Sequence, residues 1–506
     1  MRKLKSVLKI LFVAIFILSM LTACSDNEKE ETPSAVDGSG TLNDDGAQNN
    51  TSDDDTGSDE LSDGLDGLDF GGRKFSIYAA GYEMGRLEFE AEEETGAPIN
   101  DAVYKRNLAV EERLGVELNI VFAGTGSGDV GGMAQRNVQA GDHVYDLYVG
   151  HAMRMGETAL NNIYMDIYEL GYIDFSKPWW PREAIKNMSY KDHAFHVVGE
   201  VNITYLFAAY CVFFNKAIAQ DFGVPDLYQI ALDGKWTLDK KNELARDVTK
   251  DLTGAGGALT ENDQVGLTTT TGFAAASYMY GFGVTTCVMD NEGMPHMNMH
   301  PLMNDIVEKV YRLYYENPGV RAVGYLDEAW TSGDSLRLGN TFMMTHYLYA
   351  AIRLRDFETD FGILPLPKFD ENQSQYYSIS DGFHTSQAVP ITLASEDFGF
   401  VGAVIESLNA ESYKTVVPAY YDIALKMQGT RDKESEQVLE MIRDGRLVDF
   451  DLMYDGWAGF GFSLSELMVQ RSQNFTSFYE RRERQAQASL DKVIGEFERI
   501  ISRDKN

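Results

Sequence analysis

The stretch NDAVYKRNLAVEERLGVELNIVF, residues Asn100–Phe122, decides the fold class. Its first part has apolar residues at helical spacing, and we expect a core-facing stripe of Ala102, Val103, Leu108, Val110 and Leu114. Gly115 should end this helix, because glycine readily adopts the left-handed conformation that closes helices. Val116–Phe122 then alternates apolar and polar residues, as a strand does. The stretch therefore predicts a helix that leads directly into a strand.

Segments on both sides extend this pattern. Lys74–Ala79 (KFSIYA) alternates and predicts an earlier strand, and Tyr145–Val149 predicts a later one. Strands separated by helices are typical of a mostly parallel sheet with helices on its faces, and ligands of such sheets bind beyond the carboxyl ends of the strands. Those ends carry Tyr82-Glu83, a glycine-rich loop over 124–132, and Gly150-His151.

Later parts of the chain give further local predictions. Tyr205–Phe214 is an apolar run that we expect to be a buried strand, and Phe361–Leu366 predicts a short strand. Thr237 is well placed to cap a helix. Long helices are expected over Asp397–Asn409, Ser435–Asp444 and Phe478–Ser502.

The first residues have the features of an export signal. Met1–Lys9 is basic, Ile10–Leu21 is apolar but shorter than a bilayer span, and the run ends in Thr22-Ala23-Cys24. Small residues before a cysteine at this point resemble the bacterial lipobox, although an ordinary signal peptide with an incidental cysteine is the alternative. We expect residues 1–23 to be removed and Cys24 to be acylated, which would anchor the protein to a membrane by lipid.

The charge of the chain is strongly negative and unevenly distributed. Its 506 residues carry 78 acidic and 44 basic side chains, a net charge of −34. Residues 25–70 are rich in Asp, Ser, Gly and Asn and poor in apolar residues, so the segment 24–70 is predicted to be a disordered tether that begins at the lipidated cysteine. The acidic body, residues 71–506, would repel phosphate backbones, which argues against nucleic-acid binding.

Candidate motifs for catalysis, metal binding and disulfides are weak. Gly333-Asp334-Ser335-Leu336 matches a serine-hydrolase motif, but it lies deep in the chain and no histidine follows His384. His296 and His300 lie in a proline-punctuated, methionine-rich loop, which favours ordinary packing over a soft-metal site. Cys211 and Cys287 have apolar neighbours and are expected to be buried thiols. We therefore predict no enzyme activity, no cofactor and no metal.

From about Lys74 to the C-terminus the chain resembles the extracellular solute-binding proteins of ABC importers, in the carbohydrate-type family that includes maltose-binding protein. The lipobox and tether contribute to this resemblance, and so does a series of short motifs in a characteristic order. The motifs are Asn107–Leu114, Tyr145-Asp146-Leu147, Met165–Tyr168, Ile173–Trp180, Phe213–Lys216, Gly234–Thr237, Phe361–Lys368 and Val389-Pro390.

The resemblance implies an α/β fold, a two-lobed clamshell of the periplasmic-binding-protein type with interwoven lobes and strands that cross at a hinge. Lobe one would comprise about 72–205 and 378–420, and lobe two about 206–377 and 421–506. The crossings would lie in Tyr205–Cys211 and near Leu366–Tyr377. Closure of the lobes around a ligand would be a hinge motion.

By the same resemblance, particular residues are expected to line the cleft between the lobes. Carboxylates and histidines would pair with sugar hydroxyls, and aromatic rings would stack on sugar faces. The expected ligand-binding residues are Tyr82, Glu83 and His151 from lobe one, Tyr205 at the hinge, Ser380 and Asp381 after the second crossing, and Tyr347 and Trp457 from lobe two. Packing roles for the tyrosines are the alternative.

The resemblance also implies partners and a location. The protein would be a monomer on the extracellular face of the cell membrane, touching that membrane only through its lipid, and would deliver a sugar or oligosaccharide to ABC permease subunits. Two other readings remain open: a surface sensor or adhesin of the same fold without a transporter, and a surface hydrolase that uses Ser335.

Overall fold

The computed structural model describes residues 61–504 apart from 255, 258, 325–333, 355–359, 428–432 and 455–456. By contact clustering the chain separates into two units, 1–55 and 56–506, and all the elements below belong to the second unit. The signal peptide, Cys24 and the predicted tether up to residue 60 therefore lie outside the described residues. The last part of that predicted tether, 61–70, packs on the body: Leu65 is buried in the core and Asp63 pairs with Arg113. No helix in the described part of the chain is long and apolar enough to cross a membrane.

The first lobe is built on a four-stranded sheet of order β12-β3-β1-β2. β1 (Arg73–Ala79) pairs in parallel with β2 (Val116–Phe122) and β3 (Leu147–His151), and β12 (Thr385–Ala388) pairs with β3 antiparallel. The predicted βαβ arrangement is confirmed. Helices and turns of this part are α3 (Glu83–Arg86), α4 (Pro98–Leu114), α5 (Asp129–Ala140), α6 (Ala152–Ala159), η1 (Ile167–Glu169), α7 (Arg182–Met188) and α8 (Thr204–Phe207).

Helix α4 begins with Pro98 in its first turn and ends at Gly115, whose φ of 58° is left-handed, as expected. One prediction for this helix was wrong. Leu108 is 39% exposed, whereas Arg106 and Asn107 are buried. The helical turn places positions 106 and 107 with Val103 and Val110, and the Arg106 guanidinium is satisfied there by hydrogen bonds to the Glu88 carbonyl (2.7 Å) and the Ser412 hydroxyl (3.2 Å).

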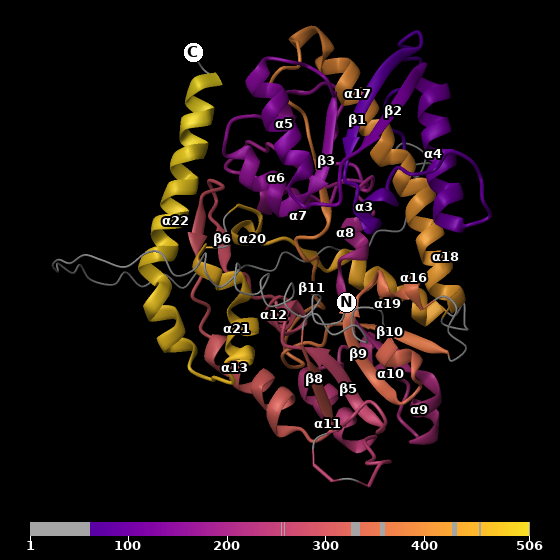
Figure 1. Ribbon diagram of the computed structural model, residues 1–506, viewed down its shortest axis with the longest axis vertical. Coiled ribbons are helices and arrows are strands. Elements are labelled where there is room, and N and C mark those ends of the chain that lie inside the picture. Colours follow the sequence, from indigo (N-terminus) through magenta and orange to yellow (C-terminus); the bar gives the residue numbers. More distant parts are fainter. Residues whose placement is uncertain are drawn as a thin grey trace, which may run out of the picture. The chain divides into compact units, whose positions relative to one another are not determined.

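Segments distant in sequence complete this lobe. Helix α17 (Phe398–Glu411) follows η3 (Ser395–Asp397) and packs against α4, and η4 (Ser412–Val416) and α18 (Val417–Met427) continue along α4 (Figure 1). On α17, Glu406 accepts hydrogen bonds from the indoles of Trp179 and Trp180, each at 2.9 Å. Both tryptophans are buried.

The second lobe is built on a five-stranded mixed sheet of order β10-β4-β9-β5-β8. The strands are β4 (Tyr210–Asn215), β5 (Val265–Thr270), β8 (Val320–Val323), β9 (Thr341–Tyr347) and β10 (Phe361–Pro365). Thr237 caps α11 by accepting from the Lys240 amide at 3.2 Å, as expected. The other elements are α9 (Lys216–Asp221), α10 (Leu227–Leu232), α11 (Leu238–Asp247), α12 (Phe273–Gly281), β6 (Cys287–Met289), β7 (Pro295–Met297), α13 (Met303–Tyr311), η2 (Arg312–Glu316), α15 (Asp334–Arg337) and α16 (Ala350–Arg353).

The segments that join the two sheets differ in part from the prediction. Tyr205–Phe214 is not one strand, because residues 204–207 form the single-turn helix α8 and only Tyr210–Asn215 is a strand. Between them, Ala209 pairs antiparallel with Ser380. β11 (Ser378–Ile379) pairs in parallel with β13 (Arg446–Leu447), so three chain segments meet at the crossing. The predicted residue ranges of the two lobes stay a prediction.

The C-terminal elements contact both lobes. α20 (Phe450–Tyr454) packs on α6, and α22 (Phe475–Asp504) packs on α13. Near the C-terminal end of α22 the Phe497 ring stacks on Tyr190, with centroids 5.0 Å apart, and Glu498 pairs with Lys191 at 2.6 Å. The remaining elements are α19 (Lys433–Asp444), η5 (Trp457–Phe462) and α21 (Ser463–Val469). Cys211 and Cys287 are buried free thiols, as predicted.

Candidate functional site

A pocket of about 260 Å³ lies where the crossing meets the strand ends of both sheets. Three groups of residues line it: Tyr82, Glu83 and Met84 after β1; Tyr347, Tyr349 and Arg353 at the end of β9 and in α16; and Ala208, Asp381 and Phe383 from the crossing. Four residues expected in the cleft, Tyr82, Glu83, Tyr347 and Asp381, thus meet in one hollow although they come from distant parts of the chain.

Aromatic rings form much of the pocket wall. The rings of Tyr347 and Tyr349 are nearly parallel, with an interplanar angle of 19° and centroids 6.5 Å apart. Across the crossing, the Tyr82 hydroxyl donates to the Phe383 carbonyl at 2.9 Å, which ties β1 to the segment after β11. Phe383 lines the pocket and is 49% exposed, so part of its ring is accessible to a ligand. Such rings offer flat apolar faces to a ligand.

An ion pair joins the two lobes at this pocket. The Arg353 guanidinium lies 2.9 Å from one Glu83 carboxylate oxygen, and the Tyr349 hydroxyl donates to the other at 2.9 Å. Burial and the hydrogen bond to Glu83 raise the pKa of Tyr349 to about 12, so its hydroxyl stays protonated and remains a donor. Glu83 and Arg353 therefore neutralise each other.

Asp381 is the other charged group of the pocket. Its side chain is almost fully buried, and one carboxylate oxygen accepts from the Phe383 backbone amide at 2.8 Å. Burial raises the pKa of this carboxyl to about 7, because a charged form loses its hydration. Ser380, expected beside it, is buried and donates to the Tyr205 carbonyl at 2.6 Å, so it holds the crossing together.

Two expected site residues lie behind the pocket wall. His151 is 6% exposed and packs against Phe383, with ring centroids 5.1 Å apart. Burial, with a smaller contribution from His384, lowers the pKa of His151 to about 3. Tyr205 is 1% exposed, and the Arg446 guanidinium lies 4.3 Å from its ring centroid. Neither residue lines the pocket. His151 packs on Phe383, which does, whereas Tyr205 packs against the His384 ring.

Two further expected residues are Cys24 and Trp457. Cys24 lies outside the described residues, and so does the side chain of Trp457. Their roles in lipidation and ligand stacking stay predictions.

Sequence reasoning missed several pocket residues, chiefly Tyr349, Arg353 and Phe383. A signal for two of them existed. Tyr349 follows Tyr347 by two positions at the end of a strand, and Phe383 lies two positions after the expected site residue Asp381. Arg353 has no local signal, because its role depends on Glu83 from the other lobe.

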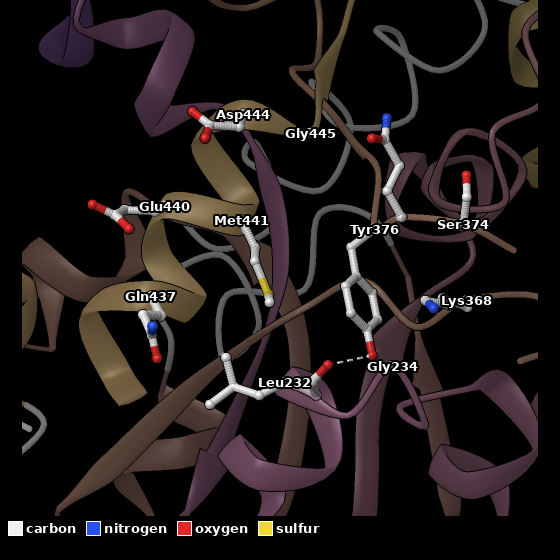
Figure 2. Close-up of a pocket in the computed structure, with 12 residues that line it drawn as sticks. Leu232, Gly234, Lys368, Ser374, Tyr376, Gln437, Glu440, Met441, Asp444 and Gly445 are labelled. Carbon is white, nitrogen blue, oxygen red and sulfur yellow. Dashed lines mark hydrogen bonds between the residues drawn. The ribbon is translucent and has the colours of Figure 1, made fainter. Parts of the chain in front are cut away.

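A larger pocket, of about 470 Å³, lies within the second lobe between α10, α19 and the segment 374–376 (Figure 2). The Met441 side chain points toward the Tyr376 ring, and the Tyr376 hydroxyl donates to the Ala231 carbonyl at 2.9 Å. Glu440 and Asp444 point away from that ring. None of the expected site residues lines this pocket, so it is not the candidate site.

Among the described residues, no group of three or more His, Cys, Asp or Glu side chains is arranged to hold a metal ion. His296 pairs with Asp290 at 2.9 Å beside the β6–β7 hairpin. The groups that a ligand can contact at the candidate site therefore include aromatic faces, hydroxyls and carboxylates.

Comparison with known proteins gives a fold but no sequence match. No family model and no curated protein matches the sequence. Solved structures do match, among them an ABC substrate-binding protein from Listeria monocytogenes in complex with cycloalternan, with 12% identity, TM-score 0.51, and 83% of this chain and 98% of that chain covered.

Two further solved structures agree with it. A cyclo/maltodextrin-binding protein complexed with maltotetraose has 11% identity and a TM-score of 0.53, with 85% of this chain and 97% of that chain covered. UspC from Mycobacterium tuberculosis has 14% identity and a TM-score of 0.53, with 83% and 100% covered. The chain has the two-lobed α/β fold of these proteins, as predicted.

Proposed function

We propose that this protein, which has the fold of ABC substrate-binding proteins, captures a solute between its lobes and delivers it to an ABC permease. The observation that carries the proposal is the convergence of Tyr82, Glu83, Tyr347 and Asp381 on one pocket at the crossing. These residues were expected in the cleft from the resemblance to solute-binding proteins. Binding and release, with no bond made or broken, is the mechanism.

The geometry suits a hinge-bending cycle. Ala209 and Ser380 pair at the crossing, next to the pocket, so a small rotation there changes the separation of the pocket walls. The Glu83–Arg353 pair spans the two lobes and forms only when the walls are close. Ligand and ion pair would therefore favour the same closed arrangement.

A sugar, as the terminal unit of an oligosaccharide, is the proposed solute. The pocket volume of about 260 Å³ lies just below the roughly 300–1,000 Å³ of sites for drug-sized ligands. It therefore suits one ring rather than a whole chain. Tyrosine faces would stack on the ring, and Asp381 would accept from a polar group of it. The cycloalternan and maltotetraose complexes of two proteins with this fold support this choice by analogy of fold.

Location and partners follow from the same proposal. The basic start, the apolar run and Cys24 support lipid anchoring at the outer face of the cell membrane, with the acidic tether between anchor and body. We propose a monomer that meets permease subunits at that membrane. A sensor or adhesin of the same fold would use the same pocket without a permease.

The hydrolase alternative has less support. Ser335 is 3% exposed in the short helix α15, so its hydroxyl is not open to a substrate. A serine nucleophile needs both access and an adjacent base.

Titration of the purified protein with a panel of mono- and oligosaccharides, followed by tryptophan fluorescence, tests the proposed function. We expect a saturable shift with at least one sugar and no product. Tyr347→Ala should weaken binding by about tenfold, whereas Tyr168→Ala, a matched change at an exposed ring outside the pocket, should not. Absence of any shift across the panel would refute solute capture of this kind, and turnover that is lost in Ser335→Ala would favour the hydrolase.

A further inference from the structure

The Asp381 carboxylate has an unusual set of partners. It is 5% exposed, yet the Phe383 amide is the one donor that reaches it among the described residues, at 2.8 Å to Oδ1. Its second oxygen receives no hydrogen bond from that part of the chain, and the residue lines the pocket. This oxygen is open to the pocket, so a ligand that enters can supply a donor to a carboxylate that is otherwise nearly buried.

No cation of the described structure balances Asp381. Arg353 lies on the pocket wall but contacts Glu83 through the ion pair at 2.9 Å. Arg446, behind the wall, pairs with the buried Glu200 at 3.2 Å. The neighbouring His384 uses Nδ1 to bond the Asp381 carbonyl at 2.7 Å, and burial lowers its pKa to about 4, so it is neutral near pH 7. With Asp381 ionised, the pocket therefore carries one uncompensated negative charge.

Four aromatic rings share the pocket with this charge: Tyr82, Tyr347, Tyr349 and Phe383. Ring faces attract cations through their quadrupoles, and the attraction is largest where water is displaced. A group of aromatic rings beside a carboxylate is the arrangement that proteins use for organic ammonium groups. A neutral sugar can also stack on these rings and donate its hydroxyls to Asp381, but it does not offset the buried charge.

We propose that the solute of this pocket carries an organic ammonium group, a protonated amine or a quaternary nitrogen, which Asp381 holds among the four rings. This inference rests on the proposed function and names the substrate class of the same pocket. An amino sugar and a small quaternary amine share the required chemistry.

Isothermal titration with two matched ligand pairs tests the inference. Choline is compared with 3,3-dimethylbutan-1-ol, which replaces its charged nitrogen by carbon, and glucosamine is compared with glucose. We expect the charged member of at least one pair to bind about tenfold or more tightly than the neutral member. The pair that shows the difference identifies the quaternary amine or the amino sugar as the closer ligand.

Asp381→Asn should abolish this discrimination, because it removes the charge and keeps the shape. Asp444→Asn is the matched control: it makes the same change at an exposed carboxylate beside the other pocket, where Asp444 pairs with Arg443, and should leave the discrimination intact (Figure 2). If Asp381→Asn does not fold, Phe383→Leu removes one half-exposed ring of the pocket and should weaken the charged probe severalfold.

Equal binding of charged and neutral members, or no binding of either charged probe, would overturn the inference. So would discrimination that persists in Asp381→Asn. If neutral sugars of the fluorescence panel still bind, the proposed function survives this failure. If they do not bind either, both proposals fall.

Discussion

Glu406 in the first lobe and Asp381 at the crossing are both buried carboxyls, and burial raises the pKa of each to about 7. They differ in their hydrogen bonds. The two Glu406 oxygens accept from the indoles of Trp179 and Trp180 at 2.9 Å, and the Asp174 amide adds a third donor at 3.4 Å. Asp381 accepts from one amide, and its other oxygen is left toward the pocket.

This difference shows how a structural carboxylate and a ligand-binding one can be told apart. Burial raises the pKa of both carboxyls to about 7, so the raised pKa does not distinguish them. The donors do. Where the protein supplies donors to both oxygens, the group holds the fold together; where it leaves one oxygen to a cavity, a ligand is expected to complete the set.

The largest expected effect tests the structural half of this comparison. Glu406→Leu leaves two buried indole N–H groups without an acceptor, and we expect it to lower the free energy of unfolding by about 3–5 kcal/mol. Urea denaturation followed by circular dichroism measures it. Glu406→Gln keeps one acceptor oxygen and should cost about half as much. A loss below about 1 kcal/mol for the leucine variant would mean that water or rearrangement replaces the carboxylate.

The second prediction concerns Asp381, whose replacement should raise the free energy of unfolding instead of lowering it. Its folded-state pKa of about 7 lies above its unfolded value near 4, so the folded state binds more protons and the free energy of unfolding falls as pH rises between those values. Asp381→Asn removes this penalty. In the absence of ligand we expect the variant to be more stable than the natural protein at pH 8 by about 1–3 kcal/mol, after a discount for the pocket's solvent.

Denaturation at pH 8 and pH 5 checks this prediction, since the gain should shrink as the pH falls and Asp381 is protonated in the natural protein. Destabilisation at pH 8 would show that Asp381 is a structural group like Glu406. A gain in stability together with a loss of ligand affinity is the expected signature of a binding residue.

The elements of the fold were largely predictable because their signals are local. Val116–Phe122 is a strand with the predicted bounds, and Gly115 ends the helix before it. The Tyr205–Phe214 run was misread, because a short apolar run does not distinguish a buried helical turn from a strand. Tertiary contacts decide between the helical turn and the strand. Here the Thr204 hydroxyl donates to the buried Glu88 carboxylate at 2.6 Å.

The candidate site was predictable only in part, for a similar reason. Tyr82, Glu83, Tyr347 and Asp381 were found through resemblance to a family, which supplies long-range information that periodicity lacks. The contrast between Glu406 and Asp381 was not predictable. Trp180 and Glu406 are 226 residues apart, and nothing near either residue indicates that they meet.

The smallest expected effect concerns charges that already have partners. Glu83 and Arg353 lie in the same pocket as Asp381, but their side chains are 68% and 33% exposed and pair with each other at 2.9 Å. A double-mutant cycle of Glu83→Gln and Arg353→Met should give a coupling free energy below about 1 kcal/mol for unfolding, and less at high salt, since water screens exposed pairs. A coupling well above this, or one that salt does not reduce, would mean that the pair is effectively desolvated by closure of the lobes.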